Sequence, residues 1–174
     1  PSQTFNGMLA PLTQTKLAGV LWYQGEDNTA NPSDYEAMFK ALILGWRAKW
    51  NADLPFYFVQ IAPYNYGDGF AGVQVRDAQR RVRRGTPETG MVMSSDIGDI
   101  KDIHPKNKKD VGLRLANLAL QKKYKIYDQL VEGPQYAAVT VQGNKAILDF
   151  DIAEGLYFSN KEQLFELAGE DNIF

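Results

Sequence analysis

The chain has 174 residues, a formal net charge of -2 at pH 7, 44% hydrophobic residues and no cysteine. This is enough for one globular domain with a sizeable core, or for one domain and part of another. The slightly acidic balance does not favour a nucleic-acid partner, and no apolar run is long enough to predict a membrane span. Disulfides, thiolate zinc sites and cysteine nucleophiles are excluded.

The two ends of the sequence lack the features of a complete chain. The first residues, PSQTFNGMLAPL, include neither an initiator methionine nor the basic-then-apolar layout of a signal peptide. The last residues, FELAGEDNIF, stop soon after a strand-like region. We therefore expect a fragment or a processed chain.

Strands alternate with helices over most of the chain. Short apolar runs predict buried strands at residues 17–24, 54–63 and 89–96. Segments with amphipathic spacing predict helices at residues 30–50, at residues 73–84 and from near Pro105 onward. For the first helix, Ser33 and Glu36 predict a capping box.

This alternation predicts an α/β fold with a parallel sheet covered by helices on both faces. In such sheets the functional residues lie in loops beyond the carboxyl ends of the strands. Two loops fit that description, QGEDN at residues 24–28 and DIGDIKDIHP at residues 96–105.

The composition changes after Tyr124. Residues 136–152 alternate between apolar and polar around a QGNK turn, which predicts a β-hairpin rather than another strand–helix unit. We place a domain boundary near Gly133, with one domain over residues 1–130 and the beginning of a truncated β-rich domain over residues 133–174.

His104 is the only histidine, and histidine is the side chain best suited to give and take protons near neutral pH. It lies between a predicted strand and a predicted helix, and Asp102 is two positions before it. In an extended backbone both side chains point the same way, so Asp102 could orient the imidazole. The alternative is a purely structural histidine. Asp96 and Asp99 are also near, but they show no diagnostic spacing of metal ligands.

The QGEDN loop offers a second group of candidates. Glu26 follows a buried strand and could act as a functional acid or as an orienting partner. Gln24 could donate its amide N–H to a developing oxyanion, and Gly25 lets the backbone approach a ligand closely. The alternative is an ordinary turn between a strand and a helix.

Five arginines fall between Arg76 and Arg84. Given the acidic total, a solvated helix face is favoured over a phosphate or nucleic-acid surface. Arg76 and Gln79 lie near the helix start and could point into the cleft. A hydrolase would also need a nucleophile, but no serine lies in a Gly-x-Ser-x-Gly elbow. The serines are Ser2, Ser33, Ser94, Ser95 and Ser159.

Several segments taken together resemble the sialate O-acetylesterase family of the SGNH hydrolase superfamily. They are NGMLAPLTQTKLAGVLWYQGEDN, VRDAQ, GMVMSSDIGDIKDIHPKNKKDVGLRLANLAL, GPQYAAVTVQGNKAILDFD and FELAGEDNIF. The resemblance implies a three-layer α/β/α catalytic domain, of which residues 1–130 are the C-terminal part. It also implies a periplasmic or secreted carboxylic ester hydrolase that removes acetyl groups from sialic acid or other glycans, without metal or cofactor.

Carried over residue by residue, the resemblance assigns His104 as the catalytic base. It also matches Gln24, Gly25 and Glu26 to the active-site block, and Asn28 and Arg76 are added as candidates for oxyanion or substrate contacts. The superfamily usually has an aspartate three residues before the histidine, where this chain has Lys101. Asp102 is therefore the first choice for orienting His104 and Glu26 the second.

The family's nucleophile block, a Gly-Gln-Ser-Asn stretch, is absent from these residues. We expect it upstream, and we expect this chain alone to be inactive. The first alternative is a carbohydrate-binding module that stacks Trp22, Tyr23, Tyr64 and Tyr66 on sugar rings. The second is a nucleic-acid-binding protein that uses the arginine helix.

Overall fold

The computed structural model describes residues 3–67, 69–157 and 165–169. The chain divides into two compact units, Pro1–Gly133 and Pro134–Phe174. None of the helices in the described ranges is long and apolar enough to cross a membrane.

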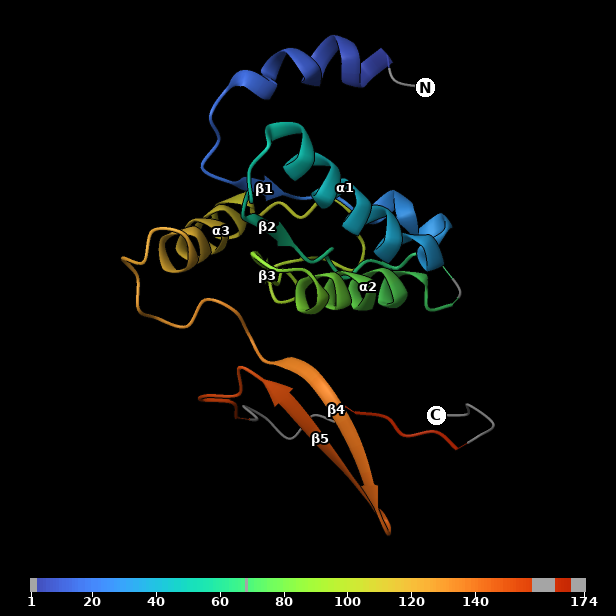
Figure 1. Ribbon diagram of the computed structural model, residues 1–174. Coiled ribbons are helices and arrows are strands. Elements are labelled where there is room, and N and C mark those ends of the chain that lie inside the picture. The colour runs from blue at the N-terminus through green and yellow to red at the C-terminus, as the bar shows by residue number, and fades with distance from the viewer. Residues whose placement is uncertain (1–2, 68, 158–164, 170–174) are drawn as a thin grey trace. The chain divides into compact units, whose positions relative to one another are not determined.

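The first unit is built on a parallel sheet (Figure 1). Its strands are β1 (Val20–Trp22), β2 (Phe56–Val59) and β3 (Thr89–Val92), in the order β1-β2-β3. All residues of β2 and β3 are buried, as expected for a sheet covered on both faces. The strands are shorter than the predicted runs because pairing stops after three or four residues and the chain turns into loops.

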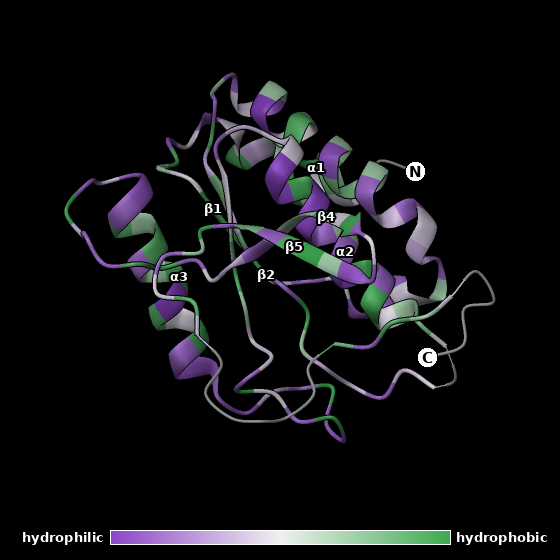
Figure 2. Cartoon of the chain, turned by 90° about the horizontal axis from the view of Figure 1, so that it is seen from below, coloured by the Kyte–Doolittle hydropathy of each residue, from purple (hydrophilic) through white to green (hydrophobic). Residues whose placement is uncertain are grey.

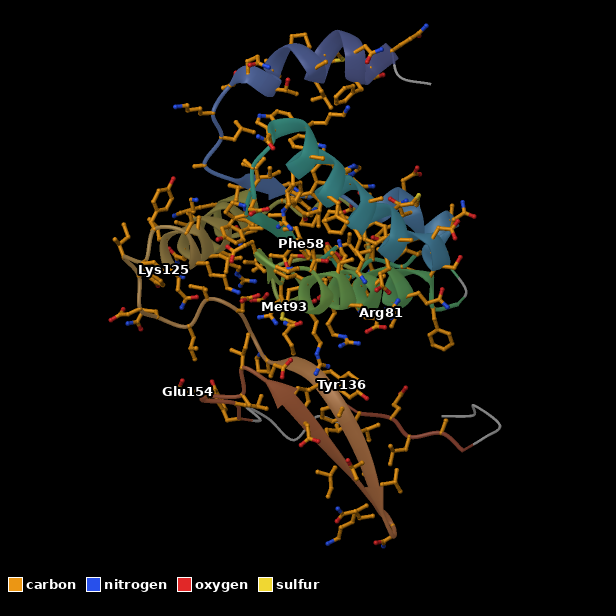
Figure 3. All side chains as sticks on the ribbon, in the orientation of Figure 1. Phe58, Arg81, Met93, Lys125, Tyr136 and Glu154 are labelled. Atoms are coloured by element: carbon orange, nitrogen blue, oxygen red, sulfur yellow. The ribbon has the colours of Figure 1, made fainter. Side chains whose placement is uncertain are left out.

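Three helices cover the sheet: α1 (Tyr35–Trp50), α2 (Ala71–Gly85) and α3 (Lys108–Lys122). Side chains of β2 alternate between the faces. Phe56 and Phe58 pack with α1 and α2, whereas Tyr57 and Val59 pack with α3. The predicted three-layer α/β/α architecture is therefore confirmed. Phe58, labelled in Figure 3, is fully buried in the first of these clusters.

The described residues of the first unit also form four short helices. They are η1 (Phe5–Leu9), η2 (Ala10–Gln14), η3 (Glu26–Ala30) and η4 (Pro32–Asp34). The first two precede β1, and the last two connect β1 to α1.

The predicted capping box of α1 is wrong. The turn η4 places Asp34 at the N-cap, one residue after Ser33, and no side chain caps the helix. Ser33 Oγ lies 3.4 Å from Asp34 Oδ1 instead. Glu36 accepts hydrogen bonds from Lys40 at 2.6 Å and from Arg81 at 2.5 Å, so its carboxylate is engaged away from the helix end.

The start of α3 near Pro105 is also wrong, because the helix begins at Lys108. The Asn107 side chain accepts a hydrogen bond from the Asp110 backbone N–H at 3.1 Å and donates one to the Asp110 carboxylate at 2.7 Å. Asparagine is a preferred N-cap because it satisfies a free N–H of the first turn. In Figure 2 the turns of α3 alternate between hydrophobic and hydrophilic residues, as expected for a helix with one buried face.

The second unit contains the hairpin predicted at residues 136–152. Its strands are β4 (Gln135–Gln142) and β5 (Lys145–Asp151), paired antiparallel with Gln142 opposite Lys145. Gly143 in the turn has a positive φ of 62°, a conformation that glycine adopts without strain.

Candidate active site

Two loops at the carboxyl edge of the sheet form one pocket. The pocket has a volume of about 190 Å³ and is lined by Tyr23, Glu26, Ile103, His104, Pro105 and Lys108. The first two residues follow β1 and the others follow β3, so the fold brings Glu26 and His104 together across 78 positions of sequence.

The side chain of His104 is 89% exposed, and its ring has no hydrogen bond to Asp102. Asp102 Oδ1 accepts a hydrogen bond from the His104 backbone N–H at 2.9 Å but lies 3.9 Å from ring Nδ1. Residues 99–102 form a turn in which the Asp102 N–H bonds the Asp99 carbonyl. Residues 103 and 104, which follow, form a bend. The backbone from Asp102 to His104 is therefore not extended, and Asp102 supports the loop that carries His104.

In the loop after β1, the candidate residues Gln24 and Asn28 are hydrogen-bonded to each other. Gln24 Nε2 donates to Asn28 Oδ1 at 2.6 Å, and the Asn28 N–H bonds the Gly25 carbonyl at 3.1 Å. An amide has two N–H donors, so Gln24 retains one that could reach a ligand.

Gly25 is buried in a conformation that excludes a side chain. Its φ is 151°, and a Cβ atom at this position would lie 2.8 Å from Ile61 Cγ2 and 3.1 Å from the Tyr35 hydroxyl. A larger residue would have to displace the core or the loop, so the turn that begins at Gln24 depends on glycine.

Several ionisable side chains line the pocket of His104. Burial raises the pKa of Tyr23, and the negative charge of Glu26 raises it further. Lys108 Nζ lies 4.8 Å from the centre of the Tyr23 ring, within cation–π range. The pocket thus presents an acid, an imidazole and an ammonium group.

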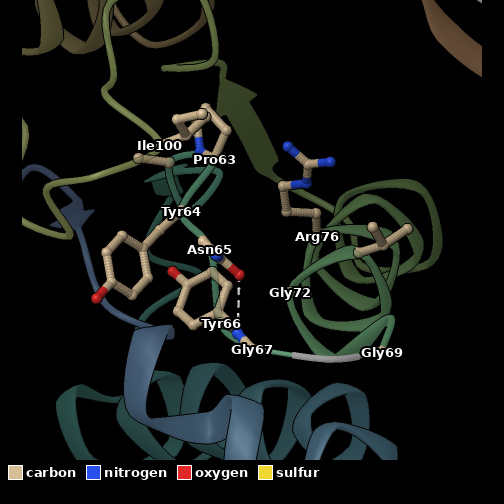
Figure 4. A pocket seen from close by; sticks show the side chains of 11 residues that line it. Pro63, Tyr64, Asn65, Tyr66, Gly67, Gly69, Gly72, Arg76 and Ile100 are labelled. Carbon is tan, nitrogen blue, oxygen red and sulfur yellow. Dashed lines mark hydrogen bonds between the residues drawn. The ribbon is translucent and has the colours of Figure 1, made fainter.

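Arg76 lines a second pocket rather than that of His104. This pocket of about 350 Å³ also includes Tyr64, Tyr66 and Ile100 (Figure 4). Burial raises the pKa of Tyr66 to about 12; Glu26 adds to that increase and Arg76 opposes it. Glu26 lines the pocket of His104 and Arg76 lines this one, so residues of both pockets influence Tyr66. Arg76 has no ion pair among the described residues.

The remaining arginines of α2 largely pair with acids. Arg80 binds Asp77 at 2.7 Å, Arg81 binds Glu36 at 2.5 Å, and Arg83 binds Glu132 at 2.9 Å. A helix face whose charges are compensated in this way does not form a basic surface for nucleic acid.

No serine within the described ranges lines the His104 pocket. Ser94 is buried and donates to the Gln60 carbonyl at 2.9 Å, and Ser95 lies in a different pocket. Ser2 and Ser159 lie outside the described residues. Within the same ranges, no group of three or more acidic or histidine residues is arranged to hold a metal ion.

The position of Gln79 in the predicted helix suggested that it points into the cleft, but the structure shows that it does not. It is fully buried and forms hydrogen bonds with the loop after β1. The sequence contains a signal for this, because Gln79 falls on the apolar face of α2 with Val75, Ala78 and Val82.

The fold and the pocket define a class of protein, a three-layer α/β/α protein with acid–base side chains at the carboxyl edge of its sheet. Comparison with known proteins identifies the family within this class. Residues 3–121 match the family described as carbohydrate esterase, sialic acid-specific acetylesterase. The chain therefore belongs to this family.

Similar proteins carry the same description. The sialate O-acetylesterase of Rattus norvegicus is 30% identical over 96% of this chain and 35% of its own length, and that of Homo sapiens is 28% identical over 96% and 36%. The crystal structure of a carbohydrate acetylesterase from Xanthomonas citri matches with a TM-score of 0.78 and 36% identity, over 84% of this chain and 35% of that one. The chain thus spans about a third of the length of these relatives.

Proposed function

We propose that this chain supplies the histidine and the oxyanion-binding loop of a carbohydrate O-acetylesterase, acting on O-acetylated sialic acid or another acetylated glycan. The observation that carries the proposal is the shared pocket of Glu26 and His104 at the carboxyl edge of the sheet. The family match supports an acetyl ester as the bond that is cleaved. It does not favour a carbohydrate-binding module without catalysis.

The proposed reaction is acyl transfer through a serine. His104 removes the proton of the serine hydroxyl, whose oxygen attacks the acetyl carbonyl, and the protonated imidazole gives that proton to the departing sugar oxygen. Water, activated by His104, then releases acetate and restores the serine. The free N–H of Gln24 and backbone N–H groups stabilise the oxyanion.

The proposed serine belongs to residues that precede this chain. Two observations support this: no serine within the described ranges lines the pocket of His104, and the relatives are about three times as long as the chain.

Two acids remain candidates for orienting His104. Asp102 is the nearer, although its carboxylate lies 3.9 Å from the ring nitrogen. Catalytic hydrogen bonds are often long without substrate, so a rotation of the exposed imidazole could close this distance. Glu26 shares the pocket and is the second candidate.

In this proposal the sugar occupies the pocket that Arg76 lines. Tyr64 and Tyr66, with ring centres 5.1 Å apart, line it and offer aromatic surface to a sugar ring. The Arg76 guanidinium offers several N–H donors to sugar hydroxyl or carboxylate oxygens. In this proposal Asn28, which accepts a hydrogen bond from Gln24, orients the Gln24 amide.

The test is the hydrolysis of an aryl acetate by the full-length protein and its His104→Ala variant. Loss of the base should lower kcat by about 10³-fold or more, because removing a member of a catalytic triad has effects of this order. Lys109→Ala, at an exposed position of α3, is the matched control and should keep the wild-type rate. A near-normal kcat for His104→Ala would rule out the proposed role.

A further inference from the structure

The side chain of Gln79 connects the ends of two strands and the first residue of a helix. It extends from α2 and is fully buried. Its Oε1 accepts a hydrogen bond from the Ile61 N–H at 2.9 Å, just after β2. Its Nε2 lies 3.2 Å from the Tyr35 hydroxyl, 3.3 Å from the Val59 carbonyl and 3.3 Å from the Gln24 carbonyl.

The Gln24 carbonyl is held from two sides. Besides Gln79, the hydroxyl of Tyr35 donates to the same oxygen at 3.0 Å. Tyr35 is itself buried, with an exposed fraction of 2%. A buried carbonyl without partners would be costly, so these two donors favour the orientation in which Gln24 C=O faces the core.

This orientation determines where the next N–H points. In a trans peptide the C=O of one residue and the N–H of the next point in opposite directions. Because the Gln24 carbonyl faces Gln79, the Gly25 N–H faces away from it. Within the described parts of the chain this N–H has no hydrogen-bond partner.

Close packing around Gly25 also stabilises the turn at Gln24 and Gly25. A Cβ atom on Gly25 would lie 3.2 Å from Gln79 Nε2, so the amide sits directly against the glycine. Rotation of the Gln24–Gly25 peptide would break two hydrogen bonds to the carbonyl and move Gln24 and Glu26, which flank Gly25.

We propose that Gln79 is a positioning residue that sets the orientation of the Gln24–Gly25 peptide, and through it the placement of the oxyanion-binding groups and Glu26. This inference rests on the proposed esterase function, for which those groups are needed. Gln79 itself does not touch the substrate. It acts by fixing a carbonyl on the buried side of the turn.

The experiment compares Gln79→Met with Val82→Ala in the full-length protein. Methionine keeps most of the volume but none of the hydrogen bonds. Val82 lies on the same helix, is equally buried and packs in the cluster that contains Tyr35, so its truncation controls for lost stability. Gln79→Met should lower kcat on an aryl acetate about 10- to 100-fold with KM changed less than twofold, since small misplacements of reacting groups have effects of this size. Val82→Ala should lower Tm but keep kcat.

Tyr35→Phe provides a second test that does not depend on the folding of Gln79→Met. It removes the other donor to the Gln24 carbonyl and keeps the ring. It should lower kcat by a smaller factor, and the double variant should lose less than the product of the two factors because both donors hold one oxygen. Fully multiplicative losses, an unchanged kcat in Gln79→Met, or an equal kcat loss in Val82→Ala would each overturn the proposal.

A second readout separates this proposal from the proposed function. The backbone amide signal of Gly25 in NMR spectra should shift in Gln79→Met and stay in place in Val82→Ala. If the wild-type protein shows no esterase activity, the proposed function fails, whereas the Gly25 signal still tests whether Gln79 holds the turn. An unmoved Gly25 signal in Gln79→Met would overturn the positioning role whatever the activity.

Discussion

At the scale of single residues, the proposed function leaves two acids as candidates for orienting His104. Asp102 bonds the His104 backbone at 2.9 Å, whereas its distance to the ring is 3.9 Å. Glu26 lines the same pocket from the other loop. A carboxylate that orients an imidazole holds the correct tautomer and stabilises the protonated ring, whereas one that bonds only backbone keeps the loop in place.

Asp102→Asn and Glu26→Gln should separate these roles. The variant that removes the orienting carboxylate should lower kcat by roughly 10²- to 10⁴-fold, because the amide favours the wrong tautomer. The other should change kcat by less than tenfold. The measurement is kcat on an aryl acetate, with amide proton exchange in the loop at residues 99–104 as the control for loop order. Equal, small effects of both changes would contradict the assignment of either acid.

At the scale of elements, the buried carboxylate of Glu132 binds the segment after α3 to the helices and the sheet of the first unit. The side chain of Glu132 is 4% exposed and accepts hydrogen bonds from Arg83 of α2 at 2.9 Å, from the Met91 N–H of β3 at 3.0 Å, and from Lys122 of α3. Burial by itself would raise the pKa of Glu132, but the hydrogen bonds from Arg83 and Lys122 outweigh it and the pKa is lowered. One side chain thus joins three elements.

Loss of this carboxylate should destabilise the first unit in a pH-dependent way. Because the folded-state pKa lies below the unfolded value, the contribution of Glu132 is present above the unfolded pKa and is lost as the pH falls through the folded one. Glu132→Gln should cost about 3 kcal/mol of unfolding free energy at pH 7, as expected when a buried ion pair loses one partner. Its deficit should shrink below about pH 4, near the unfolded pKa of glutamate.

Urea unfolding of the full-length protein at several pH values measures this effect. Asp96→Asn is the control, since Asp96 pairs with Arg114 but its side chain is 64% exposed. Its loss should cost less than about 1 kcal/mol at pH 7. A Glu132→Gln deficit that does not change between neutral and acid pH would show that the charge of Glu132 is not what stabilises the segment.

At the scale of the whole molecule, the proposed function makes this chain one part of a catalytic apparatus. The chain would supply the base and the oxyanion-binding loop, whereas no serine of the described residues lines the pocket of His104. We therefore expect the 174-residue chain alone to hydrolyse an aryl acetate no faster than its own His104→Ala variant, and the full-length protein to be active. Activity of the chain alone that disappears in His104→Ala would place the nucleophile within these residues.

Local patterns were informative about elements and less so about their ends. Apolar runs and helical spacing predicted the three strands and three long helices described in the first unit. They did so because burial of one or both faces of an element determines how its apolar residues are spaced along the sequence. Helix starts were missed at Tyr35 and Lys108. The N-cap is the residue at which the chain enters the helix, and serine and aspartate are both common there. The sequence alone therefore does not distinguish Ser33 from its neighbour Asp34 as the N-cap of α1.

The amino-acid sequence alone predicted the alternation of strands and helices and the hairpin, and it carried the resemblance that pointed to His104 and the Gln24–Glu26 loop. These features are local, or they are motifs of a few adjacent residues. Only the tertiary structure placed Glu26 and His104 in one pocket, put Arg76 in a second pocket and turned Gln79 into the core. The reason is that loops meet at a sheet edge through strand order and register, and a side chain's surroundings depend on every element packed around it.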